Sequence, residues 1–457
     1  MTRQAAPSRI TLEQIAGAPL RALARFGGSD FATRFGLKAP AERAVFLATR
    51  ASAQAISAGV AFARSNRKGG REAHPEAKRL APTPKGGLFD LTPTEEQTLM
   101  RDSMRRFADE VLRPNARKAD DAASPPAEIL EQGHALGLAG LVIPESLGGM
   151  AAERSAVTNA IIVEELARGD MGLAVAILSP LAVVQAIVEW GTGAQQARYL
   201  PPFLGDRFVG AALALLEPRP MFDPMLLRTG AVRTDGGWNL WGEKSLVPLA
   251  MQAELFVVAA DVRGLGARLF AVERGTPGLS VEAEPAMGLR GAGLGRLRFQ
   301  GARVDDDAML GELAGDGTAQ LASLVDRARI AWGATAVGTG QAVLDYVIPY
   351  CNERKAFGEP ISNRQGVAFP IADIAIELEG MRLLVLRAAS RVDREQPAAV
   401  VGRSAAIARL QCASKGVRIG SDGVQLLGGH GFIKEHPVER WYRDLRAIGV
   451  MEGALLA

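Results

Sequence analysis

The sequence predicts an α+β fold that is mainly α-helical, with an N-terminal helical bundle, a small antiparallel β-domain and a C-terminal helical bundle. Apolar residues follow a helical period, with loops, from about residue 91 to 205. Short β-prone segments separated by turn residues replace that period between about 210 and 310. Long helical segments return from Leu321 onward. A period near 3.6 is typical of amphipathic helices and a period of two is typical of strands, so the pattern predicts three packed regions.

The composition is that of a globular protein with a large core. The chain has 457 residues, of which 48% are hydrophobic and 23% charged. This balance argues against bulk disorder and leaves room for two or three domains. The two cysteines, Cys351 and Cys412, and four scattered histidines give neither a disulfide framework nor metal-ligand spacing. We therefore predict no metal site and expect both cysteines to be buried thiols in a reducing cytoplasm.

Residues 1–90 are predicted to be a basic N-terminal extension and linker. They hold 15 lysines and arginines against six acidic residues, a net charge of +9, and they end in a basic, Pro-rich stretch at 64–85. We expect a solvated or packing extension, with peripheral contact to an anionic membrane as the alternative. The segment carries no nucleic-acid-binding motif, so we expect no nucleic-acid partner. No apolar run precedes a cleavage site near the N-terminus, which favours a cytoplasmic protein.

One apolar segment has nearly the length of a membrane-spanning helix. Residues 171–188 carry no charge, and Asp170 and Glu189 bound the segment tightly. The segment contains Pro180, which interrupts helical hydrogen bonding. We therefore predict two buried helices that break near Pro180 rather than a membrane span.

Local signals place the main elements. Thr92 is predicted to cap the first helix, with Pro93 at its first position and acidic residues in its first turn. The predicted strands are 238–241, 255–259, 269–272 and 296–299, and the predicted C-terminal helices are 321–350, 365–393, 399–428 and 437–449. The domain boundaries that follow are 91–210, 211–314 and 315–457.

One glycine pair superficially resembles a dinucleotide-binding fingerprint. Gly338 and Gly340 supply two of the three glycines of that motif, but they lie inside a helical pattern instead of after a strand. We interpret the pair as a site of close helix packing.

The last hundred residues hold two groups that suit phosphate binding. Glycine adds no Cβ, and arginine adds charged donors, so backbone amides in such segments can approach a phosphate closely. The segments in question are 354–358 and 425–432, with Gln365 between them. A helix C-cap at Gly428 and Gly429, and pairing of Arg354 with a neighbouring acid, are the alternatives.

A carboxylate follows these groups near the end of the chain. Glu452 lies in a segment that we predict to be helical and mostly apolar. A carboxylate in apolar surroundings suits proton abstraction, because burial makes it more basic. The alternative is an exposed acidic residue at a helix end.

The order and spacing of these elements resemble the acyl-CoA dehydrogenase family over roughly residues 91–457. Further matching segments are 137–145, Gly148-Gly149, 191–201, 276–278, 287–290 and 304–312. The resemblance implies an FAD flavoprotein that desaturates an acyl-CoA thioester at its α,β bond. It also implies an electron-transfer-flavoprotein-type acceptor and a homodimer or tetramer, with a heteromer as the alternative.

The resemblance assigns roles to individual residues. Glu452 falls on the base that removes the α proton while flavin N5 accepts the β hydride. Asp326 and Arg329 match an Asp-x-x-Arg pair near the substrate. Arg327 or Ala328 stands where some relatives place the base instead, which favours Glu452. The positions that hold FAD, largely across a dimer contact, fall on six residues that we call the phosphate-binding candidates: Arg354, Phe357, Gln365, Gln425, Gly428 and Gly429.

Several residues depart from the family pattern near the expected flavin ring. Hydroxyl, small and stacking residues are replaced at Leu216, Phe222, Leu246, Pro248 and Ala454. Each lost hydrogen bond is worth about 0.5–1.5 kcal/mol, so three together weaken FAD binding by about one to three powers of ten. Because the ADP half keeps its residues, we expect FAD to be retained in a differently lined ring pocket. An oxidase-type relative and a non-catalytic or half-catalytic partner subunit are the alternatives.

Overall fold

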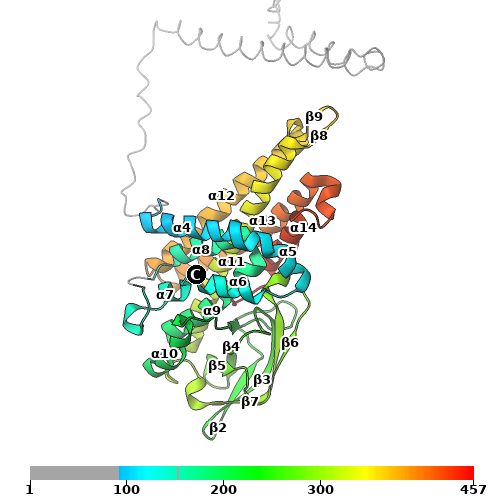
Figure 1. Cartoon of the computed structure of the whole chain (residues 1–457). Helices are drawn as coiled ribbons and strands as arrows, with labels where there is room; N and C mark the ends of the chain where they lie inside the picture. Colours follow the sequence, from blue (N-terminus) through cyan, green and yellow to red (C-terminus); the bar gives the residue numbers. More distant parts are fainter. Residues whose placement is uncertain (1–91, 152–153) are drawn as a thin grey trace, which may run out of the picture. The chain divides into compact units, whose positions relative to one another are not determined.

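The computed structural model describes residues 92–151 and 154–457, so the predictions for residues 1–90 lie outside the described residues. Along the chain, a first group of helices is followed by a β-sheet and then by a second group of long helices (Figure 1). This order confirms the predicted fold class. The domain boundaries, taken residue by residue, stay a prediction.

The first helical region is built from short and medium helices around one long apolar helix. Its elements are α4 (Glu95–Phe107), the π-helical turn η2 (Ala108–Leu112), α5 (Arg113–Ala122), α6 (Ala127–His134), α7 (Leu138–Val142), η3 (Glu145–Leu147), α8 (Ala156–Gly169), α9 (Met171–Trp190), α10 (Gly193–Tyr199) and η4 (Pro201–Leu204).

The first helix begins two residues later than predicted. Its N-cap is Thr94, not Thr92, and Pro93 precedes the helix. The Thr94 hydroxyl accepts from the Gln97 amide at 3.1 Å, and the Gln97 side chain accepts from the Thr94 amide at 3.1 Å. This reciprocal capping box satisfies two helix-end donors at once, which explains why Thr94 defines the helix start.

The apolar segment after Asp170 forms one helix, so the prediction of two helices was wrong. Helix α9 runs through Pro180, and 89% of its apolar window is buried inside the fold. A proline inside a helix costs about 3 kcal/mol, whereas each buried Val, Leu or Ile side chain contributes about 1.5–3 kcal/mol. Packing around the whole helix therefore outweighs one lost hydrogen bond. The prediction of a buried segment instead of a membrane span agrees with this placement.

The middle region is a seven-stranded sheet with the strand order β1-β4-β2-β3-β7-β6, in which β5 pairs with β4. All four predicted strands lie within observed ones. The strands are β1 (Ala211–Ala214), β2 (Gly230–Thr234), β3 (Gly237–Val247), β4 (Leu255–Val262), β5 (Gly266–Glu273), β6 (Leu279–Ala283) and β7 (Gly295–Asp305), with short 3₁₀ turns η5 (Arg290–Ala292) and η6 (Asp306–Ala308).

The sheet is mixed, which corrects the prediction of an antiparallel domain. Strand β4 pairs in parallel with β1, from Ala211 opposite Leu255, and in parallel with β2. Parallel neighbours need a long crossover, which residues 215–254 supply here. Local alternation in the sequence indicates strands but does not indicate their partners, so this pairing was not visible from the sequence.

The C-terminal region consists of long helices packed around α11. Its elements are α11 (Gly317–Glu353), the hairpin β8 (Lys355–Ala356) and β9 (Glu359–Pro360), η7 (Ile361–Asn363), α12 (Gln365–Asp393), α13 (Ala398–Leu427), η8 (Gly428–Phe432), α14 (Val438–Leu445) and η9 (Arg446–Gly449). Gly338 lies in α11 against α8, where a Cβ would come within 1.9 Å of the Glu164 carbonyl oxygen. The helix-packing interpretation of the glycine pair is therefore confirmed.

Both cysteines are buried thiols in the core of this helical region, as predicted. Cys351 lies in α11 and Cys412 in α13, and neither forms a disulfide. Burial raises the pKa of the Cys412 thiol to about 12. Since the thiolate is the reactive form, Cys412 is an inert packing residue.

Candidate active site

Glu452 lies in an irregular segment after η9 rather than in a helix, which corrects the sequence prediction. The segment is nevertheless interior, because Met451, Ala454, Leu455 and Ala457 are each at most 2% exposed. The expectation that this segment is apolar and buried was correct, but the sequence pattern did not show that its backbone is non-helical.

The turn at Gly453 explains why the chain leaves the helix at this point. Gly453 has a positive φ of 71°, and a Cβ there would lie 2.7 Å from the Cβ of Leu215 in the β-domain. Its carbonyl oxygen accepts a hydrogen bond from the Trp332 indole at 2.8 Å. Only glycine fits a left-handed backbone in such close contact. The turn therefore fixes the residue after Glu452 between α11 and β1.

Two arginines hold one oxygen of the Glu452 carboxylate. Arg329 Nη2 lies 3.4 Å and Arg409 Nη2 3.3 Å from Oε1. The other oxygen, Oε2, is buried and has no hydrogen-bond partner. The Glu452 side chain is 11% exposed. A buried acceptor without a partner in the protein is available to a water molecule or a ligand.

Of these two arginines, the sequence predicted Arg329 and missed Arg409. Arg329 and Asp326 both come from α11, as the Asp-x-x-Arg spacing requires. Arg409 comes from α13, where a single arginine on a helix gives no sequence signal for a partner 43 positions away. Burial lowers the pKa of Arg409, and the charge of Glu452 opposes that effect. The ion pair is therefore what keeps a charged guanidinium in this interior position.

Asp326 faces a cleft beside the C-terminal segment. The cleft has a volume of about 830 Å³ and is lined by both charged and apolar residues, including Arg154, Glu189, Arg327 and Asp393. Burial raises the pKa of Asp326, and the Arg329 charge partly offsets the effect. The cleft shares Leu141, Val142, Asn159 and Gln185 with a small apolar pocket that reaches Leu455 and Leu456. The structure thus brings Asp326, Arg329 and Glu452 to one region.

The six phosphate-binding candidates lie elsewhere. Arg354 caps the end of α11, Phe357 is 95% exposed in the β8–β9 hairpin, and Gln365 begins α12. Gln425, Gly428 and Gly429 lie at the exposed end of α13. A Cβ at either glycine would meet nothing within 4 Å, so the backbone there is open to an approaching phosphate.

The distance between the two groups follows from the geometry of α11. Arg329 lies in the first half of α11, whereas Arg354 lies just after its end. At a rise of 1.5 Å per residue the 25 intervening steps span about 37 Å, more than the diameter of a small domain. One protomer therefore does not surround a single small molecule with its own Glu452 and its own phosphate-binding candidates.

The residues expected at the flavin ring form a largely apolar wall. Leu216 is buried after β1, and its carbonyl oxygen accepts from the Ser245 amide at 2.9 Å. Leu246 has a positive φ of 50°, and its amide donates to Glu284 Oε2 at 2.7 Å. Phe222 packs against the helical core, with the Arg219 guanidinium 5.2 Å from its ring. The wall keeps a continuous apolar surface in place of hydroxyl groups.

A buried ion pair fixes the backbone behind this wall. Lys244 Nζ lies 3.0 Å from Glu217 Oε1 and donates to the Leu215 carbonyl oxygen at 3.0 Å. Burial lowers the pKa of Lys244 to about 8, against the opposing charge of Glu217. The pair joins the end of β1 to β3 beside Leu216, so Leu216 has a defined position.

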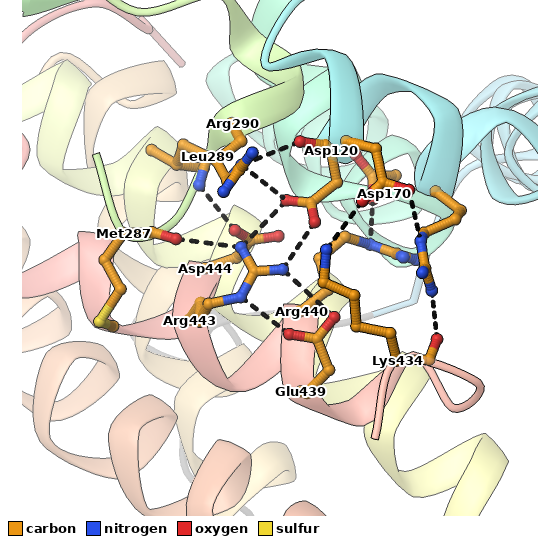
Figure 2. A network of polar contacts seen from close by, with 12 residues as sticks. Asp120, Asp170, Met287, Leu289, Arg290, Lys434, Glu439, Arg440, Arg443 and Asp444 are labelled. Atoms are coloured by element: carbon orange, nitrogen blue, oxygen red, sulfur yellow. Dashed lines mark hydrogen bonds and ion pairs between the residues drawn. The ribbon is translucent and has the colours of Figure 1, made fainter. Parts of the chain in front are cut away.

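A polar network connects α14 to the other two regions (Figure 2). Arg443 forms two hydrogen bonds with the carboxylate of Asp120 on α5, at 3.0 and 2.7 Å. It also donates to the Met287 carbonyl oxygen at 3.0 Å, while Asp444 accepts from the Leu289 amide at 2.6 Å. One arginine–aspartate pair thus joins the first helices, the sheet region and the C-terminal helices.

The same network contains a second buried pair. Arg440 Nε lies 2.9 Å from Asp170 Oδ2, and Asp170 also caps α9 by accepting from the Leu173 amide at 3.0 Å (Figure 2). Burial and the nearby charge of Asp170 raise the pKa of Asp444 to about 7. Asp170 could be recognised in the sequence as an N-cap before an apolar run, but its partner on α14 could not.

Comparisons with known proteins agree with this architecture in each of its three regions. Three family models match: the N-terminal domain of acyl-CoA dehydrogenases at residues 94–206, the middle domain at 212–302 and the C-terminal domain at 315–455. The bovine mitochondrial short-chain specific acyl-CoA dehydrogenase is 33% identical over 79% of this chain and 87% of its own length. The chain belongs to the acyl-CoA dehydrogenase family.

Two solved structures share the fold. Butyryl-CoA dehydrogenase from Megasphaera elsdenii has a TM-score of 0.72 and 29% identity, over 80% of this chain and 96% of its own. The FAD complex of PigA has a TM-score of 0.72 and 25% identity with the same coverage. Within this family of flavoproteins, the protein is an oxidoreductase that acts on CH–CH bonds.

Proposed function

We propose that the protein binds FAD and dehydrogenates an acyl-CoA thioester at its α,β bond, with Glu452 as the base. The observation that carries the proposal is the buried, unpartnered Oε2 of Glu452 beside two arginines that occupy Oε1. A carboxylate held by one oxygen can accept a proton at the other without moving. A free carboxylate oxygen that can reach the substrate proton is one requirement for a general base.

The chemistry balances with the residues present and the proposed cofactor. Glu452 Oε2 takes the α proton, and the electron pair of that C–H bond forms the α,β double bond as the β hydrogen leaves with its two electrons. FAD, when bound, would supply the acceptor for that hydride, and an electron-transfer-flavoprotein-type protein would be the final acceptor of both electrons. The buried segment around Glu452 excludes water from the reacting carbons, which strengthens the electrostatic contacts there.

We further propose that FAD is shared between two copies of the chain. The open backbone at Gly428 and Gly429, together with Arg354, suits the phosphates of FAD. Along α11, however, Arg354 lies about 37 Å from Arg329, which contacts the Glu452 of the same chain. A second copy can bring its phosphate-binding group to the first copy's apolar wall. A homodimer, or a tetramer built from it, is thus the assembly that this separation favours.

The cleft beside Asp326 is our proposed route for the CoA part of the substrate. Arg154 and Arg327 line it, where both pair with Glu189, and the adjoining apolar pocket leads toward Leu455 and Leu456. That pocket is small, and the bovine relative is named for short chains, so we propose short-chain acyl-CoA thioesters as the first substrates to test.

A second candidate function is a half-catalytic subunit that lends Glu452 to a partner. The observation in its favour is the apolar wall at Leu216 and Leu246, which offers a flavin ring no side-chain hydroxyl there. Under this alternative the purified chain alone would not retain a flavin. The two candidate functions therefore differ in whether the purified chain retains a flavin, which can be measured without a substrate.

The experiment that tests the proposal is the visible absorption spectrum of the purified chain, before and after anaerobic addition of acyl-CoA thioesters of graded length. A flavin band that bleaches with one length class supports the dehydrogenase and identifies its substrate class. A protein that stays colourless after FAD is added contradicts the proposal and favours the half-catalytic subunit. Fast reoxidation of the bleached flavin by oxygen would instead identify an oxidase-type relative.

A further inference from the structure

We propose that Arg409 is a positioning residue for the base, holding Glu452 so that only Oε2 can accept a proton. This inference rests on the proposed function of Glu452 and adds a residue that neither the sequence motifs nor the family comparisons assign. It starts from the contacts of one side chain, which joins α13 to the irregular segment at the end of the chain.

Arg409 contacts the segment at two points. Its Nη2 lies 3.3 Å from Glu452 Oε1, and its Nη1 donates to the Met451 carbonyl oxygen at 2.6 Å. One guanidinium thus fixes both the side chain of the base and the backbone immediately before it. A planar fork with two donors suits such a double contact, which a lysine ammonium cannot reproduce in the same geometry.

Arg329 and Arg409 contact the same oxygen, Oε1 of Glu452, but have different roles. Arg329 contacts only Oε1, and its Nε is buried without a hydrogen-bond partner, so it keeps a donor free for a bound molecule. The contacts that Arg409 makes among the described residues are with the chain itself, at Glu452 and at the Met451 carbonyl oxygen. We therefore assign Arg329 to the substrate side of Glu452 and Arg409 to the scaffold side.

The charges of Arg329, Arg409 and Glu452 favour these separate roles for the two arginines. Two guanidinium groups and one carboxylate leave a net charge of +1 in a largely buried cluster. Arg409 is 12% exposed, so its charge is poorly hydrated and depends on Glu452 for compensation. Conversely, an ionised Glu452 depends on both arginines. Removing Arg409 leaves one cation and frees the segment to sample other positions.

Loss of Arg409 should affect the removal of the α proton specifically. A base that is 1 Å out of place can lose about 10²-fold in rate, whereas a group that only binds substrate changes KM. Because Arg409 touches the base and not the cleft lining, its loss should slow removal of the α proton while leaving substrate binding largely intact. A residue with a merely structural role would lower stability without this selective effect.

The test compares Arg409→Met, Arg409→Lys and the control Arg403→Met in the full-length protein. Arg403 is an exposed arginine on the same helix, six residues earlier. Thermal unfolding and bound flavin are measured first, followed by kcat and KM with the best acyl-CoA. Proton removal is then followed directly, as solvent-deuterium exchange at the α carbon of a 3-thia-acyl-CoA, whose β position is sulfur and cannot deliver a hydride.

We expect Arg409→Met to lower kcat and the exchange rate together by about 10–100-fold, with KM changed less than about threefold. Arg409→Lys should restore part of both rates, and Arg403→Met should behave as wild type. Equal exchange rates in wild type and Arg409→Met would overturn the inference. If Arg409→Met does not fold, an Arg409→Lys protein that folds yet exchanges at the wild-type rate also overturns it. Absence of exchange in the wild type contradicts the proposed function itself, and the inference with it.

Discussion

At the scale of single residues, the candidate site depends on an asymmetry between the two oxygens of Glu452. Oε1 has two arginine contacts and Oε2 has none among the described residues. Burying an acceptor without a partner costs about 1–3 kcal/mol, so a site that keeps one does so against stability. Such a cost is typical of functional positions, where a ligand supplies the missing partner.

We expect Glu452→Gln to reduce turnover by about 10²–10⁴-fold, because an amide cannot take the α proton and general bases contribute about that factor. Flavin content should be nearly unchanged, since the phosphate-binding candidates lie at the other end of α11. Steady-state kinetics with a flavin absorbance ratio measure both quantities. Glu435→Gln, at an exposed position, is the matched control. Comparable turnover in wild type and Glu452→Gln would remove Glu452 from the mechanism.

At the scale of elements, α9 shows how a cap and an ion pair can combine. Asp170 ends the loop after α8, caps α9 through the Leu173 amide and pairs with Arg440 on α14. Both charged groups are more than 90% buried. One side chain therefore links a helix start in the first region to a helix in the last.

We predict that Asp170→Ala destabilises the protein by about 3–5 kcal/mol, because it leaves Arg440 buried without a partner and removes the cap. Asp170→Asn keeps an acceptor for the Leu173 amide and should lose less. Urea unfolding followed by circular dichroism measures the difference. Asp206→Ala, at an exposed turn position, controls for loss of a surface charge. An Asp170→Ala protein as stable as the control would contradict this account of the pair.

At the scale of the whole molecule, the network at Asp444 makes the contact between the regions sensitive to pH. The unfolded carboxyl has a pKa near 3.8, whereas burial raises the pKa of Asp444 to about 7 in the folded protein. Between these values the folded protein holds a proton that the unfolded chain releases. This group therefore favours folding fully below pH 3.8, and its contribution is lost as pH rises to about 7.

Asp444→Asn should remove this dependence while keeping an acceptor for the Leu289 amide. We expect the stability of the variant relative to wild type to increase between about pH 4 and 7, because in that range the unfolded wild-type chain loses the Asp444 proton that the folded protein keeps. Urea midpoints at several pH values, with Asp206→Asn as the control, measure the difference. A variant-to-wild-type difference that does not change with pH would show that Asp444 keeps an ordinary carboxyl titration.

The proposed sharing of FAD between two copies can be tested by mixing two inactive variants. Glu452→Gln lacks the base but keeps the phosphate-binding group, and Arg354→Ala retains the base but weakens that group. In a mixed dimer, one of the two sites combines both intact halves. Random mixing in equal amounts should therefore recover about a quarter of wild-type activity. Recovery no greater than the sum of the two variants measured separately would contradict a shared site.

The sequence by itself determined the mainly helical α+β class, most strands and long helices, the buried thiols and the family resemblance. These follow from periodicity, turn residues and motif spacing, which are properties of short stretches of chain. It misplaced the cap at Thr94, divided α9 at Pro180 and described a mixed sheet as antiparallel. A reciprocal contact between Thr94 and Gln97 decided the cap, and burial on all sides kept α9 in one piece. Pairing with strands distant in the sequence made the sheet mixed.

Only the tertiary structure decided what surrounds Glu452. The sequence indicated Glu452 and Arg329, but Arg409 comes from another helix and the turn at Gly453 depends on contact with Leu215. The tertiary structure also places Arg354 at the far end of α11 from the arginine that contacts the base. Ion pairs and close contacts between distant segments exist only after the chain has packed, so no local pattern encodes them.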